Sequence, residues 1–233
     1  MIMKKTYLVA LAAVSVLLTY CAPTQMVKPL YKGENQVTAH FGGPLIKFSG
    51  APIPLPFASV HYARGLTDKT TAFGGIGLTQ AAFGVVQVDL GVTQGILSPK
   101  GARPGFSVTP DVFLMYDVWQ KNIRVYPTFD ANAYWDIGKQ KSTAYVGITN
   151  WFELNGKRAF DEPQPDAWLQ GFHAGYVLRH NSWNFTLQTS FLAPFKDNVK
   201  LVPEYISFGK TGAIGVYLGV GKTFGAVQSK ARM

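Results

Sequence analysis

Histidines and aspartates at a few positions in the chain are the residues that could carry acid–base chemistry. His61 and His173 lie in segments of alternating polarity, and so do Asp89 and Asp111. An aspartate–histidine pair is the arrangement that activates a hydroxyl or a water as a nucleophile in hydrolases. No spacing in the sequence requires such a pair, so we interpret these side chains as parts of a hydrogen-bonded network.

Other short motifs have simpler explanations than chemistry. His180 and Ser182 in "RHNSW" fall in a two-residue turn, where polar side chains are common. "GVGKTFG" lacks the first glycine of a phosphate-binding loop, because Val216 stands at that position. The four histidines and the single cysteine have no metal-ligand spacing. We therefore expect no catalytic residue, no cofactor and no metal, and the protein is expected not to be an enzyme.

The single cysteine, Cys21, directly follows an N-terminal secretory pattern. Lys4 and Lys5 precede an apolar stretch over residues 7–18, which is too short for a stable membrane-spanning helix. "LTYC" resembles a bacterial lipobox, which implies that Cys21 is lipidated after a signal peptide of residues 1–20 is removed. Tyr20 departs from the small residue that this motif prefers, and an ordinary signal peptide is the alternative.

The residues after the lipobox are polar and contain prolines. We expect residues 21–33 to be a periplasmic tether between the lipid anchor and the folded domain. Ala22 is not the aspartate that retains lipoproteins at the inner membrane, so the resemblance implies delivery to the outer membrane. Without other cysteines the mature chain forms no disulfide, and its length allows it to fold without one.

From Gln36 onward, apolar and polar residues alternate with a period of two, which is typical of strands. In Asn122–Asp136 one parity is polar and the other is mostly apolar. Such runs occur at 34–41, 56–65, 70–79, 82–92, 106–118, 122–136, 141–153, 167–180, 182–193 and 212–224, with a further strand or hairpin arm at 199–208. We predict an all-β fold: a single closed antiparallel transmembrane β-barrel over residues 34–233, with about ten strands and a range of eight to twelve.

Strand length and charge placement favour a barrel in a membrane over a soluble one. Several runs exceed the roughly 9–11 residues that a tilted strand needs to cross a bilayer. A charge facing lipid at mid-depth costs about 2–4 kcal/mol, so the charged parity must face the lumen. We predict a lumen network of Asp89, Asp111, Asp117, Arg124, Asp130 and Asn132. The tryptophans lie near predicted strand ends, as in an aromatic girdle: Trp119, Trp135, Trp151, Trp168 and Trp183.

A resemblance to a broad set of outer-membrane β-barrel lipoproteins supports this interpretation. It rests on a C-x-P start, a K-G-E-x-Q stretch and a Tyr…Thr-Asp turn, carried here by Cys21, Pro23, Lys32, Gly33, Glu34, Gln36, Tyr62, Thr67 and Asp68. The resemblance implies fold and location and no particular chemistry. With an even number of strands both barrel termini face the periplasm, and 42–55, 154–166 and 194–211 become surface loops.

Four functions are compatible with the sequence. We favour a structural or accessory outer-membrane lipoprotein whose lumen is filled by polar side chains. The alternatives are a small solute channel, a lipid-modifying or proteolytic barrel enzyme, and a lipid-anchored soluble barrel that binds an apolar ligand. The formal charge of +9 has no basic cluster, so we expect outer-membrane lipid and other envelope proteins as partners and no nucleic acid.

Overall fold

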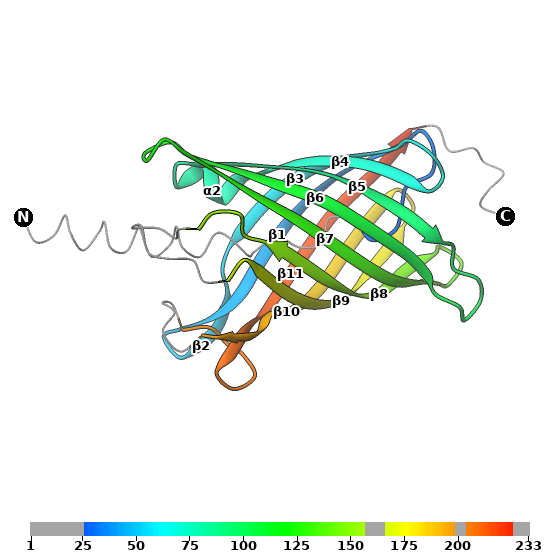
Figure 1. Ribbon diagram of the computed structural model, residues 1–233. Coiled ribbons are helices and arrows are strands. Elements are labelled where there is room, and N and C mark those ends of the chain that lie inside the picture. The colour runs from blue at the N-terminus through cyan, green and yellow to red at the C-terminus, as the bar shows by residue number, and fades with distance from the viewer. Residues whose placement is uncertain (1–25, 157–165, 199–203, 226–233) are drawn as a thin grey trace, which may run out of the picture.

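The computed structural model describes residues 26–156, 166–198 and 204–225, and it shows one closed, tilted β-barrel (Figure 1). The predicted Cys21 and signal peptide lie outside these residues. The elements are β1 (Glu34–Phe48), β2 (Ala51–Pro54), β3 (Phe57–Gly65), β4 (Thr70–Gly77), α2 (Leu78–Ala82), β5 (Val85–Leu97), β6 (Gly105–Asp117), β7 (Asn122–Ile137), β8 (Ser142–Phe152), β9 (Trp168–His180), β10 (Trp183–Asp197) and β11 (Thr211–Gly225).

Neighbouring strands pair antiparallel around the barrel in chain order, and β11 pairs with β1 to close it. This closing seam extends from Glu34↔Gly225 to Pro44↔Gly215. β2 stands apart from the wall, because it pairs only with the last residues of β1 as a short hairpin beyond the barrel. The predicted closed antiparallel barrel of ten wall strands is therefore confirmed.

Alternating polarity explains which face of each strand is covered. On β10 and β11, Phe185 lies opposite Val220 and Leu187 lies opposite Leu218, and all four side chains are about half exposed. Similar apolar side chains cover the outside of the other strands. A continuous apolar surface of this kind is unfavourable in water and is typical of the lipid-facing belt of a transmembrane barrel.

The two ends of the barrel differ in their connections. At the end where β1 begins and β11 ends, here called the terminal rim, the strands are joined by residues 66–69, 98–104, 138–141 and 181–182. At the opposite end, here called the loop end, lie the β1–β2 hairpin, α2, a short turn and two longer connections. The described parts of the three predicted surface loops lie at the loop end, but residues 42–48 continue β1 and residues 194–197 continue β10, so the first and third loops are shorter than predicted.

Two further predicted segments differ from the structure. Residues 204–208 of the expected strand at 199–208 form only isolated bridges, including Ile46↔Tyr205, while 199–203 lie outside the described residues. The expected tether is not an extended linker from Met26 onward, because these residues pack inside the barrel. No helix in the described part of the chain is long and apolar enough to cross a membrane.

Candidate functional site in the barrel lumen

Residues 26–33, here called the plug, enter the lumen and run toward the terminal rim. Met26, Val27 and Leu30 are buried, although they lie outside any strand. Met26 and Leu30 pack with Ala63 and Phe73 of the barrel wall. The polar composition of residues 21–33 predicts a tether, but the three apolar side chains of the plug are buried in the lumen.

Hydroxyl groups on the inner wall hold the plug backbone. Thr93 Oγ1 donates to the Met26 carbonyl at 3.1 Å, and Ser107 Oγ donates to the Val27 carbonyl at 2.6 Å. In the opposite sense, the Leu30 N–H donates to Thr71 Oγ1 at 2.8 Å. These bonds satisfy backbone groups that would otherwise be buried without partners.

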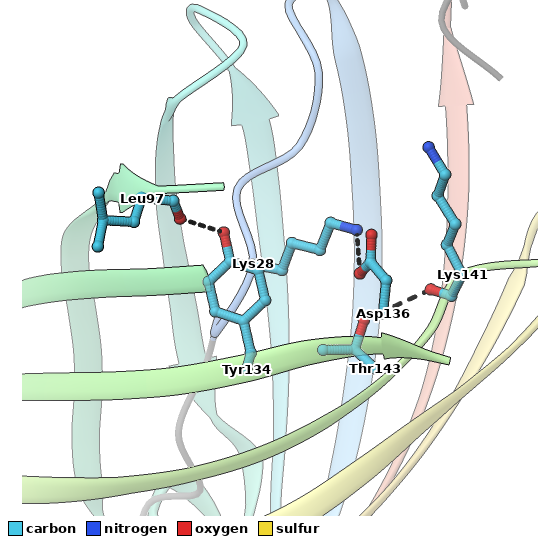
Figure 2. A network of polar contacts seen from close by, with 6 residues as sticks. All are labelled: Lys28, Leu97, Tyr134, Asp136, Lys141 and Thr143. Carbon is cyan, nitrogen blue, oxygen red and sulfur yellow. Dashed lines mark hydrogen bonds and ion pairs between the residues drawn. The ribbon is translucent and has the colours of Figure 1, made fainter. Parts of the chain in front are cut away.

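An ion pair fixes the middle of the plug to β7. Lys28 Nζ lies 2.5 Å from Asp136 Oδ1, and both side chains are mostly buried. In Figure 2 the Lys28 side chain extends from the plug to Asp136 and passes beside Tyr134, whose hydroxyl donates to the Leu97 carbonyl at 3.4 Å. Burial lowers the pKa of Lys28, and the hydrogen bond and charge of Asp136 oppose that shift.

At the terminal rim the plug turns into β1, and the residues of the K-G-E and Thr-Asp motifs meet there. The Lys32 N–H donates to Asp68 Oδ1 at 3.1 Å, and the Gly33 N–H donates to the Gly65 carbonyl at 2.9 Å. A Cβ on Gly65 would lie 2.0 Å from the Tyr31 carbonyl oxygen. These motif residues therefore have a structural role, which is to fix the point where the plug joins the barrel.

A belt of polar side chains crosses the middle of the lumen. His61 Nε2 lies 3.0 Å from Asp89 Oδ1, and His61 Nδ1 lies 3.4 Å from His40 Nδ1. His61 and Asp89 are on β3 and β5, and both are aligned with Gly75 on the intervening strand β4. A Cβ on Gly75 would lie 2.0 Å from the His61 ring, so glycine is what allows the histidine to reach the aspartate.

The same arrangement recurs on the other side of the barrel. His173 Nε2 lies 2.6 Å from Asn132 Oδ1, and His173 Nδ1 lies 3.1 Å from Thr149 Oγ1. Asn132 and His173 are both aligned with Gly147 on the strand between them. A Cβ on Gly147 would lie 2.3 Å from Asn132 Oδ1. The belt is therefore built from two long-range contacts, each passing over a glycine.

An apolar layer lines the lumen beyond the belt, toward the loop end. Phe113 stacks on Trp151 with ring centroids 5.0 Å apart, and Tyr126 lies 5.2 Å from the same indole. We call this layer the aromatic cluster; its buried members are Phe57, Val85, Phe113, Met115, Tyr126 and Trp151. The sequence pattern missed it, because these residues share a parity with polar ones.

The predicted lumen network is partly brought together. Asp89 and Asn132 each bond a histidine of the belt, and Asp111 and Asp130 lie on the same inner face of β6 and β7. Arg124 follows that inner parity of β7 nearer the loop end. Asp117 differs from the prediction, since its carboxylate accepts the N–H groups of residues 119 and 120 in a turn. A short turn needs such an acceptor for its free backbone donors.

The tryptophans divide between the outer surface and the lumen. Trp119 and Trp168 are exposed at the loop end, and Trp183 is exposed at the terminal rim. Trp135 is half-exposed near the same rim and donates to the Ala102 carbonyl at 3.2 Å. Trp151 is a correction to the predicted girdle: it is buried in the aromatic cluster and faces no lipid.

The geometry gives limited support for acid–base catalysis. The Asp89–His61 pair exists, but the second nitrogen of His61 faces His40, where a hydrolase would place its nucleophile. Ser182 lies in the β9–β10 turn at the terminal rim, as predicted, whereas His180 is the last residue of β9. Within the described residues, no three histidine, cysteine, aspartate or glutamate side chains are grouped to hold a metal ion.

Comparison with known proteins finds solved structures of similar architecture. No protein-family model matches the chain, and the curated proteins contain no match either. Among solved structures, the chain is similar to an outer membrane channel from Pseudomonas putida F1, with 10% identity and a TM-score of 0.49 over 87% of this chain and 100% of that one. It is similar to the translocator domain of the autotransporter NalP from Neisseria meningitidis, with 10% identity and a TM-score of 0.44 over 95% of each chain.

A third similar structure is the outer membrane protein OprG from Pseudomonas aeruginosa, with 10% identity and a TM-score of 0.26 over 86% of this chain and 100% of that one. All three scores lie below 0.5, so the class rests on the chain's own closed sheet and apolar outer surface. The fold is that of an outer-membrane β-barrel.

Proposed function

We propose that this protein is a non-enzymatic outer-membrane barrel lipoprotein that acts as a structural or accessory component of the cell envelope. The observation that supports the proposal is that three sets of buried side chains occupy successive levels of the lumen. The plug, the polar belt and the aromatic cluster follow one another from the terminal rim to the loop end. Barrels of about this size are commonly filled by their own side chains, and open channels appear in much wider ones.

In this proposal residues 1–20 are a signal peptide, and Cys21 carries the lipid that anchors the chain. The terminal rim faces the periplasm, which is supported by its mostly short connections and by the longer ones at the loop end. The expected partners are outer-membrane lipid, in contact with the apolar outer surface, and other envelope proteins. Labelling with radioactive palmitate, compared between wild type and Cys21→Ala, tests the anchor.

Planar-bilayer recording of the purified full-length protein tests the closed lumen. We expect no steady single-channel current, and the matched deletion of residues 26–32 is also expected to conduct little, because the belt and the aromatic cluster remain. Folding of both forms is checked by the shift in gel mobility on heating. Large, steady currents from wild type would contradict the proposal.

A gated solute channel is the second candidate, and one observation favours it. The wall beneath the plug is lined by small hydroxyl side chains, including Thr71, Thr93 and Ser107, so withdrawal of the plug would leave a polar surface. The two candidates differ in the deletion variant. A channel gated by the plug would conduct once residues 26–32 are removed, whereas a filled barrel would stay closed.

A further inference from the structure

Two acceptor oxygens, on inward-facing residues two positions apart on β5, are buried without a hydrogen-bond partner among the described residues. They are Gln87 Oε1 and Asp89 Oδ2, and their side chains are 6% and 1% exposed. His61 bonds only the other carboxylate oxygen of Asp89. Buried polar groups nearly always have hydrogen-bond partners, and burying a carboxylate oxygen without one is especially unfavourable. We therefore expect a hydrogen-bond donor beside these two atoms.

The wall beside these acceptors is apolar and aromatic. In the β5–β6 register, Gln87 lies opposite Met115 and Asp89 lies opposite Phe113. Both partners belong to the aromatic cluster, in which Phe113 stacks on Trp151. The unpaired acceptors and the aromatic cluster therefore lie on paired strands and belong to one region of the lumen.

Two carboxylates, of Asp89 and Asp111, face this region, and they outnumber the one guanidinium beside it, that of Arg124, which lies opposite Met115. Asp111 lies two residues from Phe113 on the same inner face of β6, which puts its carboxylate diagonally across from Asp89. Aromatic faces also attract cations. No group of three metal-ligating side chains is present in the described part of the chain, so an organic cation suits the region better than a metal ion.

We propose that this region is a binding site for a small amphipathic amine, such as an arylalkyl ammonium ion. Its ammonium group donates hydrogen bonds to Asp89 Oδ2 and Gln87 Oε1. Its apolar part packs against Phe113, Met115 and Trp151, with the flexible Met115 side chain adjusting to it. A few polar groups in a mainly apolar, concave surrounding are typical of small-molecule sites.

The site is nearer the loop end than the plug is. Other members of the aromatic cluster, Phe57, Val85 and Trp151, come from strand ends at the loop end. The amine therefore approaches from the loop end, and binding does not require the plug to leave. The proposal goes beyond the closed barrel proposed above, because a barrel that binds no amine can still be closed.

Titration of the full-length protein in lipid nanodiscs with phenylethylammonium tests the site. Binding is measured by isothermal calorimetry and by the change in total tryptophan fluorescence, to which Trp151 contributes, with empty nanodiscs subtracted. We expect saturable binding by wild type and at least about tenfold weaker binding by Asp89→Asn, because a charge-assisted hydrogen bond is lost. Asp117→Asn is the matched control, since it removes one carboxylate in a turn outside the site, and it should bind like wild type.

Two further measurements keep the test decisive if Asp89→Asn fails to fold. Gln87→Met removes one acceptor without changing charge, and binding should weaken severalfold. Neutral 2-phenylethanol should bind more weakly than the amine and should not distinguish Asp89→Asn from wild type. Absence of saturable binding by wild type, equal affinity in Gln87→Met, or equal affinity for the alcohol and the amine would overturn the proposal.

Discussion

Single residues decide whether polar side chains in the lumen can reach one another. His61 and Asp89 stand two strands apart, and they meet only because Gly75 between them has no side chain. Gly147 has the same role between Asn132 and His173. A glycine within a strand weakens it locally, and here each one permits a buried hydrogen bond instead.

Replacing Gly75 with alanine should break the His61–Asp89 contact. The added Cβ would lie 2.0 Å from the His61 ring, so the ring must move and leave a buried carboxylate without its donor. We expect a loss of about 1–3 kcal/mol in stability, measured by urea unfolding in detergent. Gly156→Ala is the control, since nothing lies within 4 Å of its Cβ. A Gly75→Ala variant as stable as that control would show that the contact contributes little.

The Lys28–Asp136 pair should hold the plug in place. Both partners are mostly buried, so Lys28→Met leaves the Asp136 carboxylate without its cation. We expect hydrogen exchange in a peptide covering residues 26–32 to become at least about tenfold faster, which corresponds to roughly 1.4 kcal/mol. Lys32→Met removes an exposed charge from the same segment and should change little. Equal exchange in the two variants would mean that the hydroxyl–backbone bonds hold the plug unaided.

At the scale of elements, the period-two pattern was sufficient to predict the wall strands. Asn122–Asp136 was predicted as one strand, and β7 extends only one residue further. The pattern also holds through Pro110 and Pro127, both of which keep their register positions within paired strands. The alternation predicts the strands well because one face of each strand must be apolar toward lipid, while the other faces the lumen and can be polar.

The same pattern could not predict what fills the barrel. Met26 and Leu30 lie in an aperiodic, proline-containing segment, and burial of such a segment depends on wall residues far away in the chain. Trp151 sits near a strand end like the girdle tryptophans, and only the inward parity of β8 distinguishes it. The small hydroxyl residues that line the wall beneath the plug, such as Ser107, are a feature of the sequence that leaves room for the plug.

Spin labels on β10 test which face of the strands meets lipid. Labels at Phe185→Cys and Thr186→Cys, in a Cys21→Ala background, occupy adjacent positions of opposite parity. Phe185 is exposed on the outer surface, so its label should collide frequently with oxygen dissolved in the bilayer. The label at residue 186 should be protected from oxygen. Equal oxygen accessibility at both positions would contradict a lipid-facing outer surface.

For the whole molecule, the plug and the proposed lipid anchor share one short stretch of chain. The Met26 carbonyl is held by Thr93 and Thr109, each of which lies four residues from the terminal end of its strand. At about 3.3 Å per residue and a tilt of about 40°, Met26 lies roughly 10 Å inside the terminal rim. The five steps from Cys21 to Met26 reach at most about 17 Å, so the anchor and the seated plug are compatible with little length to spare.

Deleting residues 23–25 should make it impossible for Cys21 to be anchored at the membrane surface while the plug stays in the lumen. The two remaining steps reach only about 7 Å, which is less than the distance from Met26 to the terminal rim. A lipidated chain must then withdraw the plug, and hydrogen exchange over residues 28–32 should rise to that of a free segment. The same deletion combined with Cys21→Ala should leave exchange slow, since nothing pulls on the plug. Slow exchange in the lipidated deletion would mean that Cys21 is not held at the membrane surface on the terminal side, and the proposed anchor would have to be abandoned.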